Sequence, residues 1–355
     1  MGSASALAQR DVSLGLYRPA WGSYSFLTVN TPRTPGAWQW DVGLVLDWDY
    51  RPLSMTFIGG DEREVVRHRV TAHALAQVGL WERMALGFDL PVIFQDADGE
   101  PLQDGLGDMA TVAGGDLRMS LRYRFLGPDK ILAHEPPEGW DLALQASATL
   151  PLGNGRALAG EEAITTTLEA LVDFHILGIG VGASLGWTHR FRERQLGTVR
   201  LRDALHMGVG VELPTIVIPG LSVLTEVRFA FDPENAFGDE ATTPVTLDAG
   251  LRYGVGEWTM TATAGGGLTS AIGTPEVRVI AGLNWSPRTP DKDGDGVPDA
   301  RDGCPLLAED RDGFEDHDGC LDPDNDMDFL LDEEDRCPNT PVGDDNDANN
   351  DGCPD

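Results

Sequence analysis

The sequence predicts an all-β protein, with a transmembrane antiparallel β-barrel of about twelve strands followed by an irregular repeat segment stabilised by calcium and disulfides. Three observations carry this prediction. Apolar and polar residues alternate in many stretches before residue 290, and the connections between these stretches alternate in length. After residue 290, aspartates and cysteines recur at fixed spacing.

Composition divides the chain near residue 290. The 355 residues carry a formal net charge of −32, and the part from Asp291 onward holds 24 acidic and four basic residues. A surface this acidic repels phosphates, so nucleic acid is not an expected partner. The expected segments are a secretory-signal remnant or added sequence (1–9), a pre-barrel segment (10–37), a barrel (38–286), a proline-containing linker (287–290) and the repeats (291–355).

Two features indicate export from the cytoplasm. The stretch "ASALAQ" near the start is similar to the small-residue end of a secretory signal. All four cysteines lie after residue 290 at regular spacing, which indicates disulfides formed in an oxidising compartment. The chain has no run of 18 apolar residues, so a transmembrane helix is not expected.

Period-two alternation is clearest in three stretches, 179–187, 221–231 and 245–253. Each has one apolar face and one polar or small face, as in a strand with one side toward lipid. Similar stretches of about ten residues, enough for a tilted strand to cross a bilayer, recur along the chain. The predicted strands centre near 38–50, 65–81, 83–94, 116–126, 140–151, 163–176, 178–190, 202–213, 220–232, 243–254, 257–267 and 275–285.

The connections between these strands are long and short in turn. Those at 95–115 and 233–242 are long and polar, whereas 82–83 and 177–178 are short; 127–139 breaks the trend. Long loops on one side and short turns on the other are typical of an outer-membrane barrel whose two termini lie at the short-turn, periplasmic end. A soluble β-sandwich, the alternative, has shorter strands and no such asymmetry.

Aromatic residues support the barrel. Rings at strand ends are typical of the interfacial girdle of membrane barrels. The final stretch, "VRVIAGLNW", is similar to the C-terminal assembly signal of such barrels. The tryptophans at or near predicted strand ends are Trp40, Trp48, Trp81, Trp187, Trp258 and Trp285.

Charged residues occupy the polar faces of the predicted strands. In a narrow lumen they would form paired networks that fill the interior, which we favour. Alternatively, facing positive and negative rows would line a selective channel. The residues are Arg67, Arg69, Asp89, Arg118, Arg122, Arg124, Glu169, Asp173, Glu226, Arg228, Asp248, Arg252 and Arg278.

The stretch that begins "DKDGDGVPDARD" has the oxygen spacing of a twelve-residue calcium loop. Asp291 is its first position, and Gly296 stands at the sixth, where a calcium loop turns sharply. Calcium accepts six to eight oxygen ligands, and such crowded carboxylates would repel one another without a cation. The predicted ligands are Asp291, Asp293, Asp295, the Val297 carbonyl, Asp299 and Asp302.

The same spacing returns 33 residues later, and the cysteines repeat with the same period. Position 6 of this second loop is Phe329 instead of glycine, which predicts a strained or weaker site. An EF-hand or a dockerin-like module would need a helix after each loop, where this chain has Cys-Pro. A disordered acidic tail would show no such register. The predicted ligands are Asp324, Asp326, Asp328, the Leu330 carbonyl, Asp332 and Asp335.

The runs "DKDGDGVPDARDGCP", "EDRDGFEDHDGC" and "DNDMDFLLDEEDRCP" resemble thrombospondin type 3 repeats. With the barrel and its features "LYRPAWG", "GLGDM" and "GGDLRMSLRYRFL", the chain resembles OmpA-family outer-membrane proteins of the myxobacterial type. The resemblance implies Ca²⁺ binding by the repeats, including Asp310, Asp312, Asp316 and Asp318 in the middle run. A peptidoglycan-binding OmpA domain usually follows; no helix-rich segment of that kind is found in 291–355.

The four cysteines can pair in more than one way. Pairing neighbours in sequence, Cys304–Cys320 and Cys337–Cys353, closes two loops of about 15 residues, each worth roughly 3 kcal/mol of chain entropy. The alternative pair Cys320–Cys337 would leave Cys304 and Cys353 to bridge the ends of the spacer. We expect the sequential pairing, because segments with so few apolar residues need cation ligation and cross-links for order.

Three functions follow as hypotheses. The favoured one is a structural and interaction protein, with the barrel in the bacterial outer membrane, calcium-stiffened repeats in the periplasm and long loops outside. The resemblance implies a protein partner, a role in cell envelope anchoring, cell–cell contact or outer-membrane exchange, and peptidoglycan binding only through a further domain. The alternative is a narrow channel for small polar solutes. We expect no enzyme, because the barrel histidines are scattered over separate strands without a serine motif.

Overall fold

The computed structural model describes residues 14, 17–56, 62–81, 83–97, 110–127, 139–161, 163–196, 199–235, 240–287, 293, 295, 297, 299, 302–310, 312–342 and 351–354. The chain divides into two compact units, Met1–Pro287 and Arg288–Asp355, and each is described by itself. Within the described ranges, no helix has the length and apolar character needed to cross a membrane.

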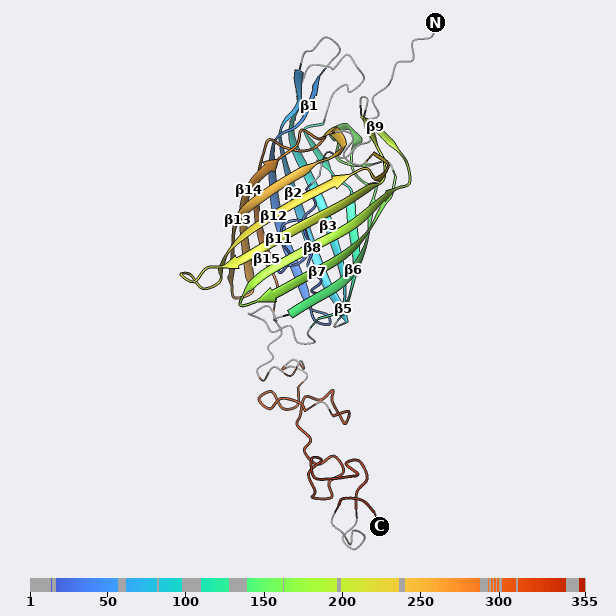
Figure 1. Cartoon of the computed structure of the whole chain (residues 1–355), viewed down its shortest axis with the longest axis vertical. Coiled ribbons are helices and arrows are strands. Elements are labelled where there is room, and N and C mark those ends of the chain that lie inside the picture. Colours follow the sequence, from blue (N-terminus) through green and yellow to red (C-terminus); the bar gives the residue numbers. More distant parts are fainter. Residues whose placement is uncertain are drawn as a thin grey trace. The chain divides into compact units, whose positions relative to one another are not determined.

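The first unit is a closed antiparallel barrel of twelve long strands, tilted against the barrel axis (Figure 1). All twelve predicted strands are present. They are β1 (Trp40–Thr56), β2 (Glu62–Trp81), β3 (Met84–Ala97), β5 (Leu117–Leu126), β6 (Gly139–Leu150), β7 (Thr165–Ile176), β8 (Ile179–Arg190), β11 (Ala204–Pro214), β12 (Leu221–Phe231), β13 (Val245–Val255), β14 (Trp258–Gly267) and β15 (Val277–Trp285).

Each long strand pairs with its neighbour in sequence, and the barrel closes where β1 pairs with β15, from Val42↔Trp285 to Tyr50↔Val277. Short elements occupy the connections. They are β4 (Val112–Gly114), which pairs with β3, the hairpin of β9 (Arg194–Leu196) and β10 (Val199–Leu201), and the 3₁₀ turns η1 (Gly155–Ala157), η2 (Pro233–Asn235) and η3 (Glu240–Thr242).

The two ends of the barrel differ as the sequence predicts. We call them the turn end, where β1 begins and β15 finishes, and the loop end. At the turn end, Leu177 and Gly178 both have left-handed φ angles of 51° and 77°, as a tight two-residue hairpin turn requires. The connection 127–138 is the long exception at this end. The loop end carries the longer connections, such as 151–164 and 232–244.

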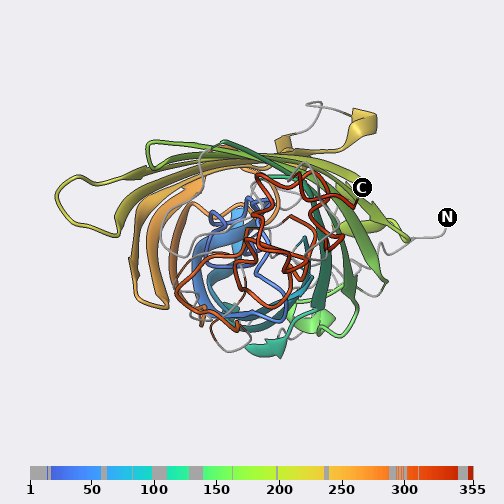
Figure 2. The same cartoon turned by 90° about the horizontal axis from the view of Figure 1, so that it is seen from below.

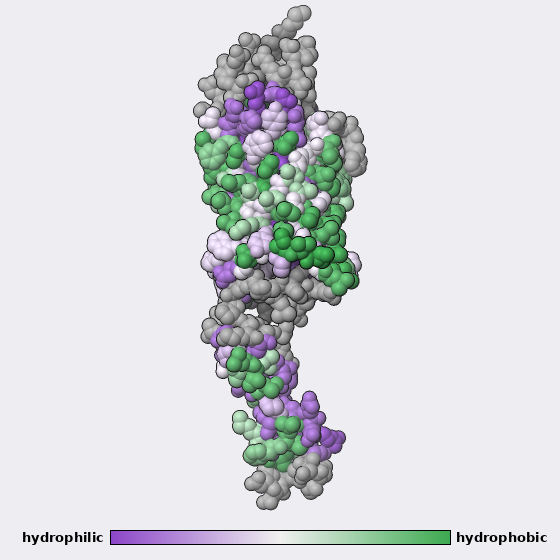
Figure 3. Space-filling view, turned by 90° about the vertical axis from the view of Figure 1, so that its left-hand side faces the viewer, coloured by the Kyte–Doolittle hydropathy of each residue, from purple (hydrophilic) through white to green (hydrophobic). Residues whose placement is uncertain are grey.

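The outer face of the barrel is apolar, and its inner face is polar. Along β12, for example, Val223 and Val227 are 40% and 37% exposed, whereas the intervening Glu226 is 2% exposed. On the face that it views, Figure 3 shows a largely hydrophobic zone across the wall, with a more hydrophilic zone above it. This alternation is the signature of a strand with lipid on one side and a polar lumen on the other.

Aromatic side chains gather at both ends. Five exposed tryptophans stand at strand termini of the turn end, namely Trp40, Trp81, Trp140, Trp258 and Trp285. Toward the loop end, the Trp48 ring stacks on His68 with centroids 5.9 Å apart, and His68 also contacts Tyr50 at 5.3 Å. Two aromatic girdles of this kind are typical of membrane barrels.

The second unit has neither helix nor strand in its described residues. Its chain is instead held by turns in which an aspartate side chain accepts a hydrogen bond from the backbone two residues later, as Asp318 does from Cys320 and Asp335 from Cys337. Such turns suit a segment with few apolar residues, since they satisfy the backbone locally.

Candidate functional site

The lumen is filled by the chain's own N-terminal segment. Residues 17–35, which we call the plug, are almost all buried, and Figure 2 shows this blue part of the chain inside the ring of strands. The sequence-based division placed these residues in a separate pre-barrel segment. They lie within the barrel because their apolar and polar side chains find partners on its inner face.

The plug crosses the barrel from one end to the other. At the loop end, the Leu14 amide donates to the Leu158 carbonyl at 3.0 Å. At the turn end, the Trp38 amide donates to the Gly79 carbonyl at 2.7 Å, just before β1 begins. At Leu14 the chain therefore lies at the loop end, whereas the N-terminus itself, which we expected at the turn end, is outside the described residues.

Glu226 of β12 makes the densest polar contact with the plug. Its carboxylate accepts hydrogen bonds from the backbone amides of Leu27, Thr28 and Val29 at 3.0–3.1 Å, and from the Thr28 hydroxyl. Hydrogen bonds to a charged acceptor are the strong ones in proteins, and the carboxylate is nearly inaccessible to solvent. One wall side chain thus fixes three successive plug residues.

Arginines of the wall also donate hydrogen bonds to the plug backbone, at other positions along the barrel axis. Arg122 donates to the Arg33 carbonyl at 2.8 Å and to the Asn30 side chain at 2.9 Å. Arg118 donates to the Pro19 carbonyl, and its guanidinium lies 3.9 Å from the centre of the Trp21 ring. A buried guanidinium group needs several hydrogen-bond acceptors, and carbonyl groups of the plug are some of these acceptors.

The plug also contributes charge of its own. Arg33, 5% exposed, donates to His175 at 2.8 Å and lies 3.7 Å from Asp173 and 3.9 Å from Asp141. At the start of β1, the Ser23 amide and hydroxyl both donate to Asp41, at 2.7 and 2.5 Å. These contacts place a plug group against three buried carboxylates, as burial of charge requires.

Apolar contacts complete the seal. Plug side chains form one buried cluster with inward-facing wall residues: Tyr17, Trp21, Phe26, Leu27, Val29, Val45, Leu75, Leu224 and Ile280. Wall glycines make the room. A β-carbon at Gly182 or Gly210, which pair across β8 and β11, would stand 2.3 or 2.5 Å from the Phe26 ring. On the small face of 179–187, Gly182 therefore makes room for the plug, whereas Gly180 and Gly186 make room for His175 and His206 of the wall.

Two small cavities lie between plug and wall in the described part of the barrel. One of about 60 Å³ is lined by Tyr17, Arg69 and His73 among others, and one of about 30 Å³ by Phe26, Val45 and Ile280 among others. Spaces of this size have room for a few water molecules.

Most of the predicted lumen charges face inward. Ion pairs join Arg278 to Asp49 at 2.9 Å and Arg118 to Asp89 at 3.0 Å, so the expected paired network is present. Arg67 is the exception, because a bulge between Val66 and His68 turns it outward, where its side chain is 59% exposed beside Glu64. Arg228 is half-buried. Buried at 8% exposure or less are Arg69, Asp89, Arg118, Arg122, Arg124, Glu169, Asp173, Glu226, Asp248, Arg252 and Arg278.

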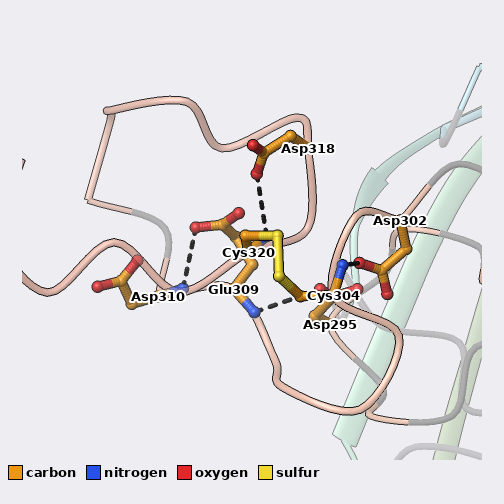
Figure 4. Close-up of a disulfide and its surroundings, with 7 residues drawn as sticks. All are labelled: Asp295, Asp302, Cys304, Glu309, Asp310, Asp318 and Cys320. Carbon is orange, nitrogen blue, oxygen red and sulfur yellow. Dashed lines mark hydrogen bonds between the residues drawn. A yellow bond between two sulfur atoms is a disulfide. The ribbon is translucent and has the colours of Figure 1, made fainter.

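In the second unit, the first predicted calcium loop gathers three of its carboxylates. Ligand oxygens of Asp293, Asp295 and Asp302 all lie within 4.8 Å of one another. Figure 4 shows Asp295 and Asp302 beside the disulfide, where Asp295 also accepts the Glu309 amide at 3.2 Å. Asp295 is fully buried. Asp291 lies outside the described residues.

The second loop gathers Asp324, Asp326 and Asp328 within the same 4.8 Å limit. Phe329, at the glycine position, has a left-handed φ of 78°. This conformation disfavours a residue with a β-carbon by roughly 1–2 kcal/mol. Asp332 and Asp335 are not part of this trio; they accept the backbone amides of Asn325 and Cys337.

Two buried groups near these clusters were not predicted. Asn325, 6% exposed, donates to Asp312 at 2.5 Å, and its carbonyl oxygen has no hydrogen-bond partner. Glu309, 9% exposed, is also buried, and its carboxylate accepts the Asp310 amide at 3.1 Å. Neither stands at a position of the carboxylate repeat, so spacing gives no signal for them. Of the middle-run aspartates, Asp316 accepts the Gly313 amide and Asp318 the Cys320 amide.

Both expected disulfides are present, Cys304–Cys320 and Cys337–Cys353, with Cα atoms 5.0 and 5.2 Å apart. Electrostatics within the clusters are unfavourable without a cation. Burial and the charges of Asp293 and Asp295 raise the pKa of Asp302 above its usual value. Burial and the charges of Asp312 and Asp324 do the same for the pKa of Asp332.

Comparisons with known proteins bear on the barrel. No family model matches the chain, and no curated protein matches it. In solved structures, 72% of this chain matches 97% of an outer-membrane channel from Pseudomonas putida F1, with a TM-score of 0.51 and 13% identity. The NanC porin matches 69% of this chain over 99% of its own length, with a TM-score of 0.43 and 7% identity. The likeness to the Pseudomonas channel shows that the first unit has the fold of an outer-membrane β-barrel.

Proposed function

We propose that this protein is a closed outer-membrane barrel that anchors a calcium-binding, disulfide-linked spacer, in the manner of OmpA-family proteins with thrombospondin type 3 repeats. One observation carries the proposal. Residues 17–35 fill the lumen and bond to several strands around it, as Glu226 of β12, Arg122 of β5 and Asp41 of β1 illustrate. A barrel filled in this way serves as a membrane anchor and not as an open pore.

The contacts of the plug support permanent closure. If the plug left, buried groups such as Glu226 and Arg122 would lose acceptors or donors that water would have to replace. The inward-facing Leu75, Leu224 and Ile280 would become exposed to a polar lumen. Exposure of such side chains costs about 1.5–3 kcal/mol each, so the closed state is strongly favoured.

Calcium binding by the second unit is supported by the two carboxylate trios. Asp295 and Asp302 are buried next to each other, and burial of like charges is unfavourable unless a cation joins them. Carboxylate, amide and backbone carbonyl oxygens are the ligands that calcium prefers. We propose that the ligands predicted from the sequence bind Ca²⁺, with Asn325 and Glu309 as additional oxygen donors.

For orientation, we propose that the loop end faces outward and the turn end the periplasm, as in barrels with long outer loops. The second unit follows β15, which finishes at the turn end, so its repeats would extend into the periplasm. The long loops would then be available to a protein partner, in cell contact or outer-membrane exchange, and a further domain would be needed to hold peptidoglycan.

Solute flux tests the closed barrel. The full chain is reconstituted into liposomes, and swelling is followed in isotonic solutions of small sugars, with an open porin as the positive control. We expect the rate of protein-free liposomes. Swelling at the porin's rate would contradict the anchor and favour an open channel.

A narrow channel is the second candidate, and one observation favours it. Arg118, Arg122 and Arg124 of β5 form a basic row on the inner wall, while Asp47 and Asp49 of β1 are acidic. Facing rows of opposite charge are a feature of selective pores. This function requires that the plug leaves the lumen, and it predicts flux that rises when plug contacts are removed.

A further inference from the structure

The connection between β11 and β12 presents an unusual apolar surface. Its sequence, "LPTIVIPGL" at 213–221, contains no charged residue. Ile216, Val217 and Ile218 are 103%, 81% and 47% exposed. A nearby turn at the same end, Gly256–Glu257, carries a charge instead. Consecutive aliphatic residues in the open are costly in water and call for an explanation.

Backbone hydrogen bonds hold this hairpin. The Thr215 amide donates to the Leu221 carbonyl at 2.8 Å, and the Leu221 amide donates to the Ile218 carbonyl at 3.2 Å. Gly220 has a left-handed φ of 79°, and its carbonyl accepts the Gly254 amide of β13 at 2.8 Å. The aliphatic side chains are therefore held outward by a fixed backbone.

The neighbouring β7–β8 turn extends the surface. A β-carbon at Gly178 would stand 3.1 Å from the Pro214 ring, so the two turns are in contact. Leu177 is 82% exposed and Ile176 45% exposed. Figure 3 shows strongly hydrophobic atoms toward the lower end of the barrel on the side that it views. We call this surface the turn-end patch: Ile176, Leu177, Leu213, Ile216, Val217 and Ile218.

The patch is continuous with the lipid-facing rows of the same strands. Leu213 belongs both to the patch and to the outer face of β11, and Val223 and Val181 continue outward on β12 and β8 at 40% and 41% exposure. No charged residue separates 213–218 from this row along the chain. The lipid that covers the outer wall is therefore expected to cover the patch as well.

The distribution of tryptophans supports the same occupant. Among the exposed tryptophans of the turn end, Trp38 precedes β1, and the five at strand termini belong to β1, β2, β6, β14 and β15. Indole rings prefer the membrane interface, whereas aliphatic side chains prefer its hydrocarbon interior. In the described residues, β8, β11 and β12 carry aliphatic residues at this end where other strands carry tryptophan. The hydrocarbon boundary thus lies further toward the turns on this side.

We propose that the turn-end patch is immersed in the acyl chains of the adjoining leaflet, so that the β11–β12 hairpin acts as a lipid anchor that sets the depth and tilt of the barrel. This rests on the membrane placement in the proposed function. The occupant is lipid and not a partner protein.

A single labelled cysteine tests this inference in the full chain. The four native cysteines are all in disulfides, so Ile216→Cys adds the only free thiol for an environment-sensitive NBD dye. Glu257→Cys, in the polar turn at the same end, is the matched control. In liposomes, we expect quenching of the Ile216→Cys label by lipids with a spin label on the acyl chain, and at least fivefold weaker quenching by aqueous cobalt than for the control.

Two results would overturn the proposal. Quenching of the Ile216→Cys label by cobalt as strongly as the control would place the hairpin in water. Protection from both quenchers would indicate a protein partner or a second copy of the chain. The same label on Leu177→Cys repeats the quenching measurement at the β7–β8 turn. Quenching of the native tryptophans by the same lipids reports barrel insertion, so a failure of the membrane placement itself is distinguishable.

Discussion

The ring of Phe26 lies directly against Gly210 of β11. A β-carbon at Gly210 would stand 2.5 Å from this ring, closer than real side chains approach, and Gly182 opposes it across the strand pair. The wall is thus shaped for one plug side chain. Since Phe26 precedes β1 and Gly210 is in the eighth long strand, this contact joins segments far apart in the sequence.

Gly210→Ala is expected to destabilise the barrel, because the added methyl group overlaps the Phe26 ring and overpacking costs about 1–3 kcal/mol. Gly282→Ala is the matched control: its β-carbon would meet its nearest neighbour, Val45, at 3.6 Å, an ordinary contact. The free energy of unfolding in urea, measured in lipid vesicles, compares them. Equal stabilities for the two variants would contradict the fit of Phe26.

Glu226→Gln is expected to loosen the plug. A neutral amide offers one oxygen to the amides of Leu27, Thr28 and Val29, which now share a carboxylate. Loss of charged hydrogen bonds costs about 1.5–3 kcal/mol. We expect faster proteolysis within 17–35 in the folded barrel. The exposed Glu257→Gln serves as control, and unchanged cleavage rates would count against the role of Glu226.

Phe329→Gly is expected to tighten calcium binding by the second loop. Glycine adopts a φ of 78° without a β-carbon clash. Relief of this clash is worth roughly 1–2 kcal/mol, which corresponds to about five- to thirtyfold in affinity. Phe329→Ala removes the ring but keeps the β-carbon, so it should bind as the native chain does. Calorimetric titration of the full chain in detergent measures both. If alanine tightens binding as much as glycine, backbone strain is not the cause.

Acidification should affect the repeats oppositely with and without calcium. Because the pKa of Asp302 is raised, the metal-free fold binds extra protons, and its stability rises as the pH falls toward the ordinary aspartate pKa of about 3.9. Calcium needs the carboxylates deprotonated, so its affinity falls over the same range. Protease resistance of the repeats at pH 7.5 and 5 reports both. Equal pH trends with calcium and with chelator would refute this account.

Much of the barrel follows from local sequence. Alternation fixes which residues face lipid, and tight turns such as Leu177–Gly178 fix where strands reverse, so all twelve strands are predicted within a few residues. Arg67 was assigned to the wrong face because a bulge shifts the register, and single bulges leave no clear mark in the alternation.

The plug could not be predicted in the same way. It has no alternation, its feature "LYRPAWG" does not indicate a place inside the barrel, and its main partner, Glu226, is nearly 200 residues distant in the chain. One signal was present: Val45, Leu75, Leu224 and Ile280 are apolar residues on otherwise polar strand faces. An apolar group facing a lumen needs cover, and only a segment outside the strands could provide it. The carboxylate trios, by contrast, follow from spacing because their ligands are close in sequence.

Single-channel recording tests the closed barrel most directly. The full chain and a variant without residues 17–35, each checked for insertion by its gel shift on boiling, are recorded in planar bilayers; a double variant, Arg122→Gln with Glu226→Gln, is measured in parallel. We predict a silent full chain, discrete steps from the shortened chain, and steps of intermediate frequency from the double variant. Steps of equal size and frequency from the full and the shortened chain would contradict closure by the N-terminal plug.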